Sequence, residues 1–504
     1  MLDFTTIYTL TVFSLMVLFL FWRPHGINES IPPTISALFI FFAGIVPLSD
    51  IFKILGFVSG ASITILSTIV MSIVLDSIGF FRWAAFNLVK RAKGSGVMLY
   101  WYINLLCFLM TMFFNNDGSI LITTPIIIQI VTILKLKANQ QFPYLLSGAL
   151  IATASSAPIA VSNLANLIAL KIIGLDLNSY VSMMFVPSMI GIITISLLLF
   201  YYFSKDIPKI INVLPVGNNE VNNPKAFPTI LRDPSSKKQH KPHPQPHSGP
   251  QSLLHPEPHP HLDEHPHPHH NQHPHHPTPP HQLIDNIISP PEPDMSMFKV
   301  CIVIVALTRA GLFIGTSFGI PMEWIGIFGA LLLIGYRWYH RGDGVNDIVK
   351  KTPWHIILFA FSIYVVVYSL HNIGLTGWIV EQLRGPILAN HLNACLISGG
   401  LLTVMSNLFN NLPSVMIGTF TLTGMVLDIP TLHIAYLATI IGADIGSLIT
   451  PMGTLASLIW MFILRENGIK IRWADSVKVT IMVIPIGLLI SLLSLYVWVE
   501  WLFY

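Results

Sequence analysis

Charged residues are scarce in this sequence. Asp, Glu, Lys and Arg make up 10% of the 504 residues, whereas hydrophobic residues make up 53% and the mean hydropathy is +0.66. A soluble protein usually carries about a quarter charged residues. Apolar stretches close to the length of a bilayer span recur, for example at 5–22, 179–203 and 479–498. The composition therefore excludes a soluble protein and predicts an all-α polytopic membrane protein.

Cysteine is almost absent, and the three that occur, Cys107, Cys301 and Cys395, lie within apolar stretches. They give neither a disulfide framework nor the spacing of a metal site. Near the N-terminus stands Asp3 with no basic segment, so we expect a retained first span and not a cleaved signal peptide. A phosphate-binding loop and the context of a hydrolase triad are also missing. The sequence thus predicts no enzyme, no cofactor, no nucleic-acid partner and no ATP hydrolysis within this chain.

One long segment departs from the apolar composition. Residues 204–296 are polar and rich in Pro and Asn, and 14 of the 20 histidines fall between His240 and His281. Such a segment lacks the apolar surface that folding requires, so it is predicted to be a disordered cytoplasmic linker. It separates a first membrane repeat, 1–203, from a second membrane repeat, 297–504.

Closely spaced imidazoles in this linker are potential ligands for Zn, Ni, Cu or Co. The weak candidates for metal binding are His265, His267, His269, His270, His273, His275 and His276. Because no fixed tetrahedral spacing occurs, incidental metal affinity is favoured over a dedicated site.

The two membrane halves resemble each other in sequence. Three islands align in the same order and in nearly constant register: 75–88 with 370–383, 114–123 with 409–418, and 162–168 with 453–459. Duplicated halves are typical of secondary transporters, which bind their substrates where the repeats meet.

Basic residues alternate between corresponding loops of the halves. Two loops of the first half are basic, with Arg82, Lys90, Arg91, Lys93, Lys135 and Lys137, and the corresponding loops of the second half contain only Arg384. In the opposite direction, a loop of the second half is basic, with Arg465, Lys470 and Arg472, and in the corresponding loop of the first half basic and acidic residues balance. Since cytoplasmic loops carry excess Lys and Arg, corresponding loops are predicted on opposite sides of the cell membrane. The expected fold is two inverted repeats, each about five transmembrane helices, one discontinuous, plus a re-entrant helical hairpin. Three spans are predicted between an external N-terminus and the cytoplasmic loop at 82–95. Both termini are predicted to be external.

Polar residues interrupt the apolar run at 97–134. "FFNNDGSILITTP" places Asn115, Asn116, Asp117 and Gly118 between limbs of 18 and 16 residues, which are short for a span of about 20. This predicts a re-entrant hairpin, mirrored at 393–427. The long segments 143–170 and 431–464 are likewise interrupted, which predicts discontinuous helices that line a cavity or are buried in protein.

These interruptions supply the candidate site. The predicted substrate-binding residues are Asn115, Asn116, Ser119, Ser162, Asn163, Asn166, Asn410, Asn411, Ser414, Thr450 and Thr454; the predicted proton-coupling residues are Asp117, Asp444 and Asp76. Amides and hydroxyls at membrane depth bind solutes, but they also hold helices together. Intramembrane carboxyl groups seldom occur without a role, and Asp117 is favoured as the proton carrier because its counterpart is Leu412. For Arg309, a pairing with an acidic residue across the bundle is expected.

The motifs "FFNNDGSILITTP", "ASSAPIAVSNLAN", "LFNNLPSVMIG" and above all "TPMGTLASLIW" resemble the arsenite/antimonite efflux permease family (ArsB type). This family belongs to an ion-transporter superfamily that includes Na⁺/H⁺ antiporters and carboxylate carriers. The likeness covers both membrane halves but not 204–296. It departs at three positions: the family pattern has an Asp where this chain has Thr153, an Asn where it has Asp444, and a Lys or Arg where it has His371.

The resemblance implies export of trivalent arsenic or antimony hydroxide in exchange for protons, and optional pairing with a cytoplasmic arsenite-stimulated ATPase. Two alternatives stay open at this point. One is a Na⁺/H⁺ antiporter or an anion or carboxylate carrier of the same superfamily. The other is a metal-handling protein that acts through the His-rich linker. Homo-oligomer formation is also left open.

Overall fold

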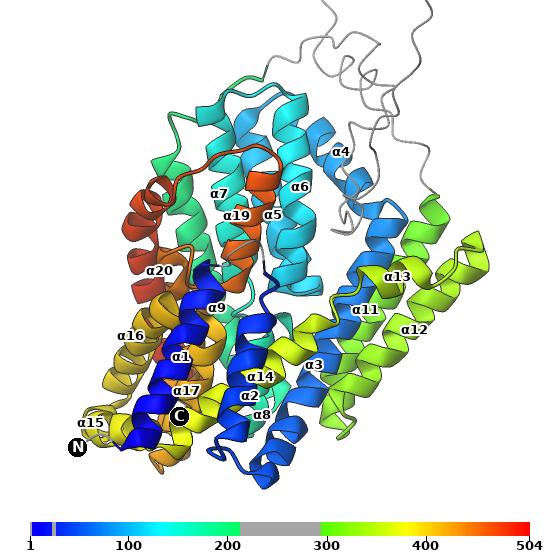
Figure 1. Ribbon diagram of the computed structural model, residues 1–504. Helices are drawn as coiled ribbons and strands as arrows, with labels where there is room; N and C mark the ends of the chain where they lie inside the picture. Colours follow the sequence, from blue (N-terminus) through cyan, green and yellow to red (C-terminus); the bar gives the residue numbers. More distant parts are fainter. Residues whose placement is uncertain (1–2, 23–26, 212–293) are drawn as a thin grey trace, which may run out of the picture.

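The computed structural model describes residues 3–22, 27–211 and 294–504. Every regular element in these ranges is helical, and ten stretches are long and apolar enough to cross a membrane (Figure 1). The predicted all-α polytopic fold is thereby confirmed. The histidines proposed as weak metal ligands lie outside the described residues.

The first half contains nine α-helices and a short 3₁₀ turn. They are α1 (Phe4–Trp22), α2 (Ile31–Phe42), α3 (Leu48–Ser77), α4 (Phe80–Ala92), α5 (Gly96–Phe113), α6 (Asn116–Ile133), α7 (Ala138–Ala154), η2 (Ala160–Ser162), α8 (Leu164–Ile173) and α9 (Leu177–Tyr202). The second half repeats this order with one additional short helix. Its elements are α11 (Met295–Ser317), α12 (Met322–Arg341), α13 (Asn346–Lys351), α14 (His355–Asn372), α15 (Leu375–Leu388), α16 (His391–Phe409), α17 (Asn411–Gly424), α18 (Ile429–Asp444), η5 (Gly446–Ile449), α19 (Leu455–Glu466) and α20 (Trp473–Leu502).

The predicted helix interruptions lie where the sequence placed them. The first hairpin is α5 and α6, which break at Phe114 and Asn115, and the second is α16 and α17, which break at Asn410. The two discontinuous segments are α7–η2–α8 and α18–η5–α19. Helices α7, α8 and α18 and both breaks are largely buried in protein, as irregular backbone at membrane depth requires, whereas α19 buries only one side.

One predicted span is shorter than expected. We expected three spans before the loop at 82–95, but α2 has only 12 residues, which rise about 18 Å, against a hydrocarbon core of about 30 Å. Pro32 and Pro33 stand in its first turn, and Gly44 follows its end with a φ of 70°. Proline favours a helix start and a left-handed glycine a helix end, so local sequence limits α2 at both sides.

The correspondence between halves extends to backbone geometry and packing. Gly79 and Gly374, 295 residues apart, have φ values of 85° and 86°, and Lys135 and Val426, 291 apart, have 48° and 51°. Helix contacts are reciprocal: α6 packs on α19 as α17 packs on α8, and α3 packs on α12 as α14 packs on α2. Figure 1 places α4 near the top of the molecule and α15 near the bottom. The inversion of the halves across a membrane stays a prediction.

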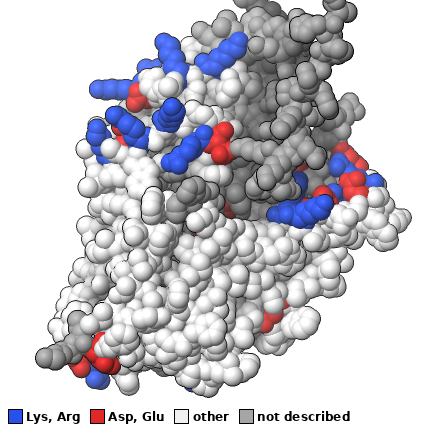
Figure 2. All heavy atoms as spheres, viewed as in Figure 1, with Lys and Arg blue, Asp and Glu red and all other residues white. Residues whose placement is uncertain are grey.

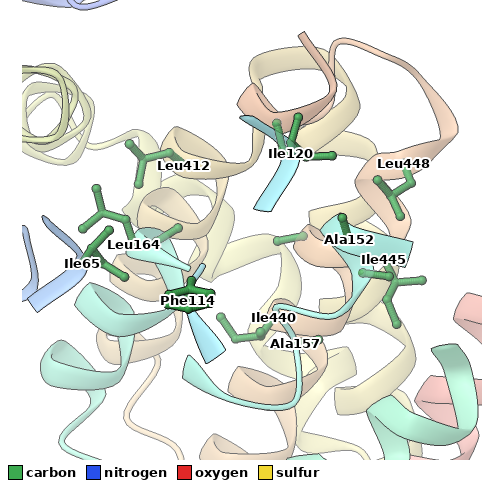
Figure 3. Close-up of a cluster of buried hydrophobic side chains, with 14 of the residues drawn as sticks. Ile65, Phe114, Ile120, Ala152, Ala157, Leu164, Leu412, Ile440, Ile445 and Leu448 are labelled. Carbon is green, nitrogen blue, oxygen red and sulfur yellow. The ribbon is translucent and has the colours of Figure 1, made fainter. Parts of the chain in front are cut away.

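In the view of Figure 2, Lys and Arg gather at the upper end, where α6 joins α7 and α19 joins α20. A second group of charged residues lies at the right edge near α12 and α13, and most of the remaining surface is uncharged apart from small charged patches lower down. The buried hydrophobic residues of both halves form one continuous cluster. Figure 3 shows part of it, with Phe114, Leu164, Leu412 and Ile440 drawn from four different helices or their ends.

Candidate functional site

The first hairpin tip is organised by two asparagines. Asn115 caps α6: its Oδ1 accepts from the N–H of Gly118 at 3.0 Å. Asn116 Oδ1 accepts from the N–H of Asp117 at 2.8 Å. Both side chains are buried, and they satisfy N–H groups that a helix start leaves unpaired. The tip is thus a polar, N–H-rich point within an apolar core.

The second hairpin tip has a different geometry. Asn410 adopts φ 76° and ψ 156°, and its Nδ2 donates to the carbonyl of Met452 at 3.3 Å. Asn407, one turn earlier, donates to the carbonyl of Gly446 at 2.9 Å and accepts from the N–H of Thr450 at 2.8 Å. These bonds fasten the end of α16 to the break between α18 and α19.

Asp444 joins the halves. It ends α18 and is 1% exposed, and its carboxylate accepts three hydrogen bonds from the first half. Ser156 Oγ and Asn166 Nδ2 donate to Oδ2 at 2.8 and 2.6 Å, and Asn163 Nδ2 donates to Oδ1 at 2.8 Å. Hydrogen bonds to a charged acceptor are the stronger kind, and a buried carboxylate needs them.

Two buried tyrosines lie beside this junction, one from each half. The ring centroids of Tyr180 and Tyr436 are 6.3 Å apart. Tyr180 donates to the carbonyl of Ala157 at 2.6 Å, and Tyr436 to the carbonyl of Asn166 at 3.4 Å. The Tyr180 hydroxyl thus satisfies a carbonyl in the irregular backbone between α7 and η2, and the Tyr436 hydroxyl adds a bond to a carbonyl in the first turn of α8.

Several buried polar atoms around the breaks have no partner among the described residues. They are Ser162 Oγ, Asn166 Oδ1, Asn410 Oδ1, Ser447 Oγ and Thr450 Oγ1. Buried polar atoms in native proteins are almost always paired with protein or water, so unpaired ones call for an explanation. Their gathering at both breaks and at the second tip is what a site for a polar solute or water would produce.

The remaining predicted residues are distributed around this centre. Ser119 donates to the carbonyl of Cys107 at 3.4 Å, and Ser414 donates to the carbonyl of Asn410 at 2.8 Å. Thr454 caps α19 by accepting from the N–H of Ser457 at 3.0 Å. Asn411 is buried at the start of α17. These four side chains lie on the hairpins and the second discontinuous segment, where the sequence placed them.

The carboxyl groups proposed for proton coupling differ in their surroundings. Asp117 is half-buried at the first tip and interacts electrostatically with Asp444 and with Glu29. Asp76 lies at the end of α3, with Lys351 and Arg82 as charged neighbours. Its counterpart His371 is exposed at the end of α14 and bonds Thr376. Only Asp117 and Asp444 are therefore close to the junction of the halves.

The expected acidic partner of Arg309 is not what the structure contains. Its Nε donates to the carbonyl of Phe113 at 2.6 Å, and its Nη2 donates to the carbonyl of Phe114. The expectation was wrong because the end of α5 offers unpaired backbone carbonyls, which also accept hydrogen bonds from a guanidinium. Arg309 thereby holds the first hairpin tip from α11.

Gly453 explains part of the "TPMGTLASLIW" motif. A Cβ at this position would lie 1.9 Å from the carbonyl oxygen of Ser447, so any larger residue would displace the backbone between η5 and α19. Glycine is the residue that permits such close backbone approach. The motif therefore has a structural role beside the one proposed for its threonines.

Sequence reasoning left three contributing residues out of the candidate list. Ser156 bonds Asp444, Asn407 bonds both sides of the second break, and Arg309 holds the first tip. Ser156 and Arg309 carried a signal, since each is polar within an apolar stretch. Asn407 precedes the Asn-Asn pair by one turn and could have been found in the same way. Within the described residues no group of three His, Cys, Asp or Glu could hold a metal ion.

The fold and this junction define a class of protein. The described residues combine ten stretches long and apolar enough to cross a membrane with two similar halves, whose broken helices carry buried polar groups where the halves meet. This is the architecture of a secondary transporter.

Comparison with known proteins assigns the family. The profile of the family described as "Citrate transporter" (CitMHS) matches residues 16–442. The chain is 44% identical to the "Putative arsenical pump membrane protein" of Bacillus subtilis (strain 168), over 97% of this chain and 99% of that protein. It is 27% and 28% identical to the "Arsenical pump membrane protein" of Escherichia coli and of Escherichia coli (strain K12), in each case over 92% of both chains. The chain belongs to the CitMHS family and is a multi-pass membrane transporter of the ArsB type.

Proposed function

We propose that this transporter exports a trivalent metalloid hydroxide, such as As(OH)₃ or Sb(OH)₃, across the cytoplasmic membrane in exchange for protons. The observation that carries the proposal is Asp444, a single buried carboxylate at the junction of the halves, surrounded by neutral donors and by unpaired acceptors. Likeness to arsenical pump proteins supports the choice of solute.

The chemistry of the junction suits a neutral, hydroxyl-rich solute. Each hydroxyl of As(OH)₃ is both a donor and an acceptor. The unpaired Asn166 Oδ1 and Asn410 Oδ1 would accept from it, and Thr450 Oγ1 would donate to it or accept from it. The other candidates, Asn115, Asn116, Ser162 and Asn411, would complete the site from the tips and the first break. A multiply charged anion would instead need several cations here.

Proton exchange would follow from how Asp444 is held. Ser156, Asn163 and Asn166 all belong to the first half, whereas Asp444 belongs to the second. Donors to a carboxylate stabilise its charged form. If the halves move relative to each other during transport, the carboxylate loses these donors and takes up a proton. Asp117, at the neighbouring tip, would be the second group that holds the proton in part of the cycle.

The orientation of the chain is part of the same proposal. With the basic upper end of Figure 2 in the cytoplasm, the connection at 204–296 is cytoplasmic and both termini are external. The three-part division into 1–203, 204–296 and 297–504 then gives two inverted membrane repeats joined inside the cell.

Everted membrane vesicles with an acidic interior test the proposal. Arsenite should accumulate in them, and Asp444→Asn should abolish accumulation while Asp117→Asn should reduce it. Asp475→Asn is the matched control, because Asp475 is an exposed partner of Arg472 at the start of α20 and should leave flux unchanged. No accumulation by the unaltered protein, or full accumulation by Asp444→Asn, would contradict the mechanism.

A second candidate is a Na⁺/H⁺ antiporter or a carboxylate carrier. Backbone carbonyls and amide oxygens at broken helices also bind Na⁺, and the matching family profile is described as a citrate transporter. A flux panel of arsenite, Na⁺ and citrate in the same vesicles separates the three. Citrate flux that saturates and is lost in Asp444→Asn would favour the carrier over the metalloid exporter.

Two further possibilities concern the His-rich linker, which lies outside the described residues, and a separate partner protein. Deletion of 240–281 tests the metal-handling alternative, because unchanged arsenite flux would make the His-rich linker an accessory. Co-expression with an arsenite-stimulated ATPase tests whether such a partner increases export.

A further inference from the structure

A cavity of about 290 Å³ opens between α5, α9 and α11, beside the first hairpin tip. Its walls are Phe108, Leu109 and Phe113 of α5, Phe185 of α9, Val161 of η2, and Arg309 with its neighbours on α11. Its volume is near the lower end of the range of small-molecule pockets, about 300–1,000 Å³. Arg309 is the one charged or hydrogen-bonding side chain on these walls.

Arg309 has donor capacity that the protein does not use. The side chain is 7% exposed, and its Nε and Nη2 are bonded to the carbonyls of Phe113 and Phe114. Its Nη1 has no partner among the described residues. A guanidinium carries five N–H donors and prefers a planar carboxylate or phosphate. Arg309 contributes to the wall of this apolar cavity, and its Nη1, although shielded from solvent, is the group left to pair with an anion that enters. A ligand that suits both features combines an anionic group with an apolar tail.

The cavity faces the membrane-exposed surface. Leu109, Phe113 and Phe185 on its rim are 40%, 42% and 38% exposed, and these helices present apolar residues outward. Arg309 lies eight residues from the nearer end of α11, a rise of about 12 Å. It is therefore close to the middle of a hydrocarbon layer of about 30 Å.

We propose that this cavity binds the carboxylate of a free fatty acid, with Arg309 as its anion-binding residue. A phospholipid fits less well, because its two chains and its bulky headgroup exceed a cavity of this size. A single-chain acid enters sideways from the bilayer, places its tail along the exposed apolar rim and brings its carboxylate to Nη1.

Binding at this place acts on the first hairpin. Arg309 holds the carbonyls of Phe113 and Phe114 at the end of α5, and the same guanidinium would bind the fatty acid. Phe113 and Phe114 directly precede Asn115. When the fatty acid weakens the hydrogen bonds from Arg309 to their carbonyls, the tip of the hairpin therefore shifts. The bound acid is thus a modulator of the transporter and not its cargo.

Photolabelling of the purified full-length protein in lipid nanodiscs tests the site. A palmitic-acid analogue with a diazirine in its chain should label α5, α9 and α11 near the cavity, as mapped by mass spectrometry. Unlabelled palmitate should compete, and palmitate methyl ester should compete about tenfold less well, since it lacks the charge that Nη1 requires. Arg309→Met should reduce labelling by about tenfold or more.

Two substitutions of membrane-facing residues on α5 test the site while leaving Arg309 in place. Their result therefore does not depend on whether the Arg309→Met variant folds. Leu109→Trp fills the rim and should block labelling, whereas Leu105→Trp lies one turn away, 49% exposed and outside the cavity wall, and should not. Equal competition by the methyl ester, unchanged labelling in Arg309→Met, or an equal loss in both tryptophan variants would overturn the proposal.

Discussion

At the scale of single residues, the two hairpin tips differ in one backbone conformation. Asn410 has φ 76° and ψ 156°, whereas its counterpart Asn115 has φ −162° and ψ 168°. The first pair of angles falls in a region that only glycine adopts freely, at a cost of about 1–3 kcal/mol for other residues, while the second is ordinary extended backbone. Strain of this kind is kept where the surrounding structure and function require the side chain.

Replacing Asn410 with Gly should therefore stabilise the protein while reducing transport. Relief of strain should raise the free energy of unfolding by about 1 kcal/mol, after allowance for the extra freedom of glycine in the unfolded chain. Flux should fall because the bond to Met452 and the unpaired Oδ1 are lost. Unfolding in detergent and vesicle flux measure the two effects.

Asn115→Gly is the matched control. It relieves no strain and removes the cap on Gly118, so stability should fall by about 0.3 kcal/mol. An equal change in stability for both variants would contradict a special role of the Asn410 backbone.

Much of the candidate site could be predicted at this scale, but its pairings could not. Asp444, Asn163 and Asn166 are recognisable because polar residues are costly in apolar stretches. The bonds between them join residues 278 and 281 positions apart, and no local pattern encodes such a pair. For the same reason the sequence suggested an acidic partner for Arg309, whereas the actual partners are carbonyls, which every residue has.

At the scale of elements, the starts of several helices are fixed by acidic caps. Asp428 precedes α18, and its carboxylate accepts from the N–H of Thr431 at 3.2 Å. Hydrogen bonds from the hydroxyl and N–H of Thr431, with a smaller effect of His391, hold the pKa of Asp428 below its usual value. Because the folded-state pKa is lowered, the cap's contribution is complete above about pH 4 and is lost as the pH falls through the folded-state value.

Substitution of Asp428 should separate capping from charge. Asp428→Ala should lower the free energy of unfolding by about 0.5–2 kcal/mol near neutral pH. Asp428→Asn should keep most of the cap, and its contribution should not change between about pH 3 and pH 6, since an amide does not titrate there. Unfolding curves across this pH range would contradict the assignment if the unaltered protein and the Asp428→Asn variant responded identically to acid.

Element boundaries were the most predictable part of the fold. Asn-Asn pairs followed by Asp-Gly or Leu-Pro marked both hairpin tips, and interrupted apolar runs marked both discontinuous segments. The short α2 was missed, because Pro32 and Pro33 are compatible with a helix start and the apolar run continues past Gly44. A helix end inside an apolar run has only a weak signal in the sequence.

At the scale of the whole molecule, the two loops with matching positive φ values provide a test of inversion. Lys135 and Val426 are both exposed and occupy equivalent places in the halves. The three native cysteines are buried, so Lys135→Cys and Val426→Cys would each introduce one accessible thiol among the described residues. In intact cells a membrane-impermeant maleimide should label the Val426 variant, and it should label the Lys135 variant only after permeabilisation. Labelling of both from one side would contradict inverted repeats.

The fully buried carboxylate at the junction of the halves has an electrical consequence. Asp444 corresponds to the neutral Thr153, so one half alone supplies the ionisable group at this position. Exchange of one proton for one uncharged solute would move one net charge per cycle, and a membrane voltage of 100 mV would add about 2.3 kcal/mol to export. That corresponds to a concentration ratio of about fifty. With the pH equal on both sides, a potassium diffusion potential set by valinomycin should therefore suffice to drive arsenite into everted vesicles when their interior is positive. A cell could then expel the solute by voltage even in alkaline surroundings.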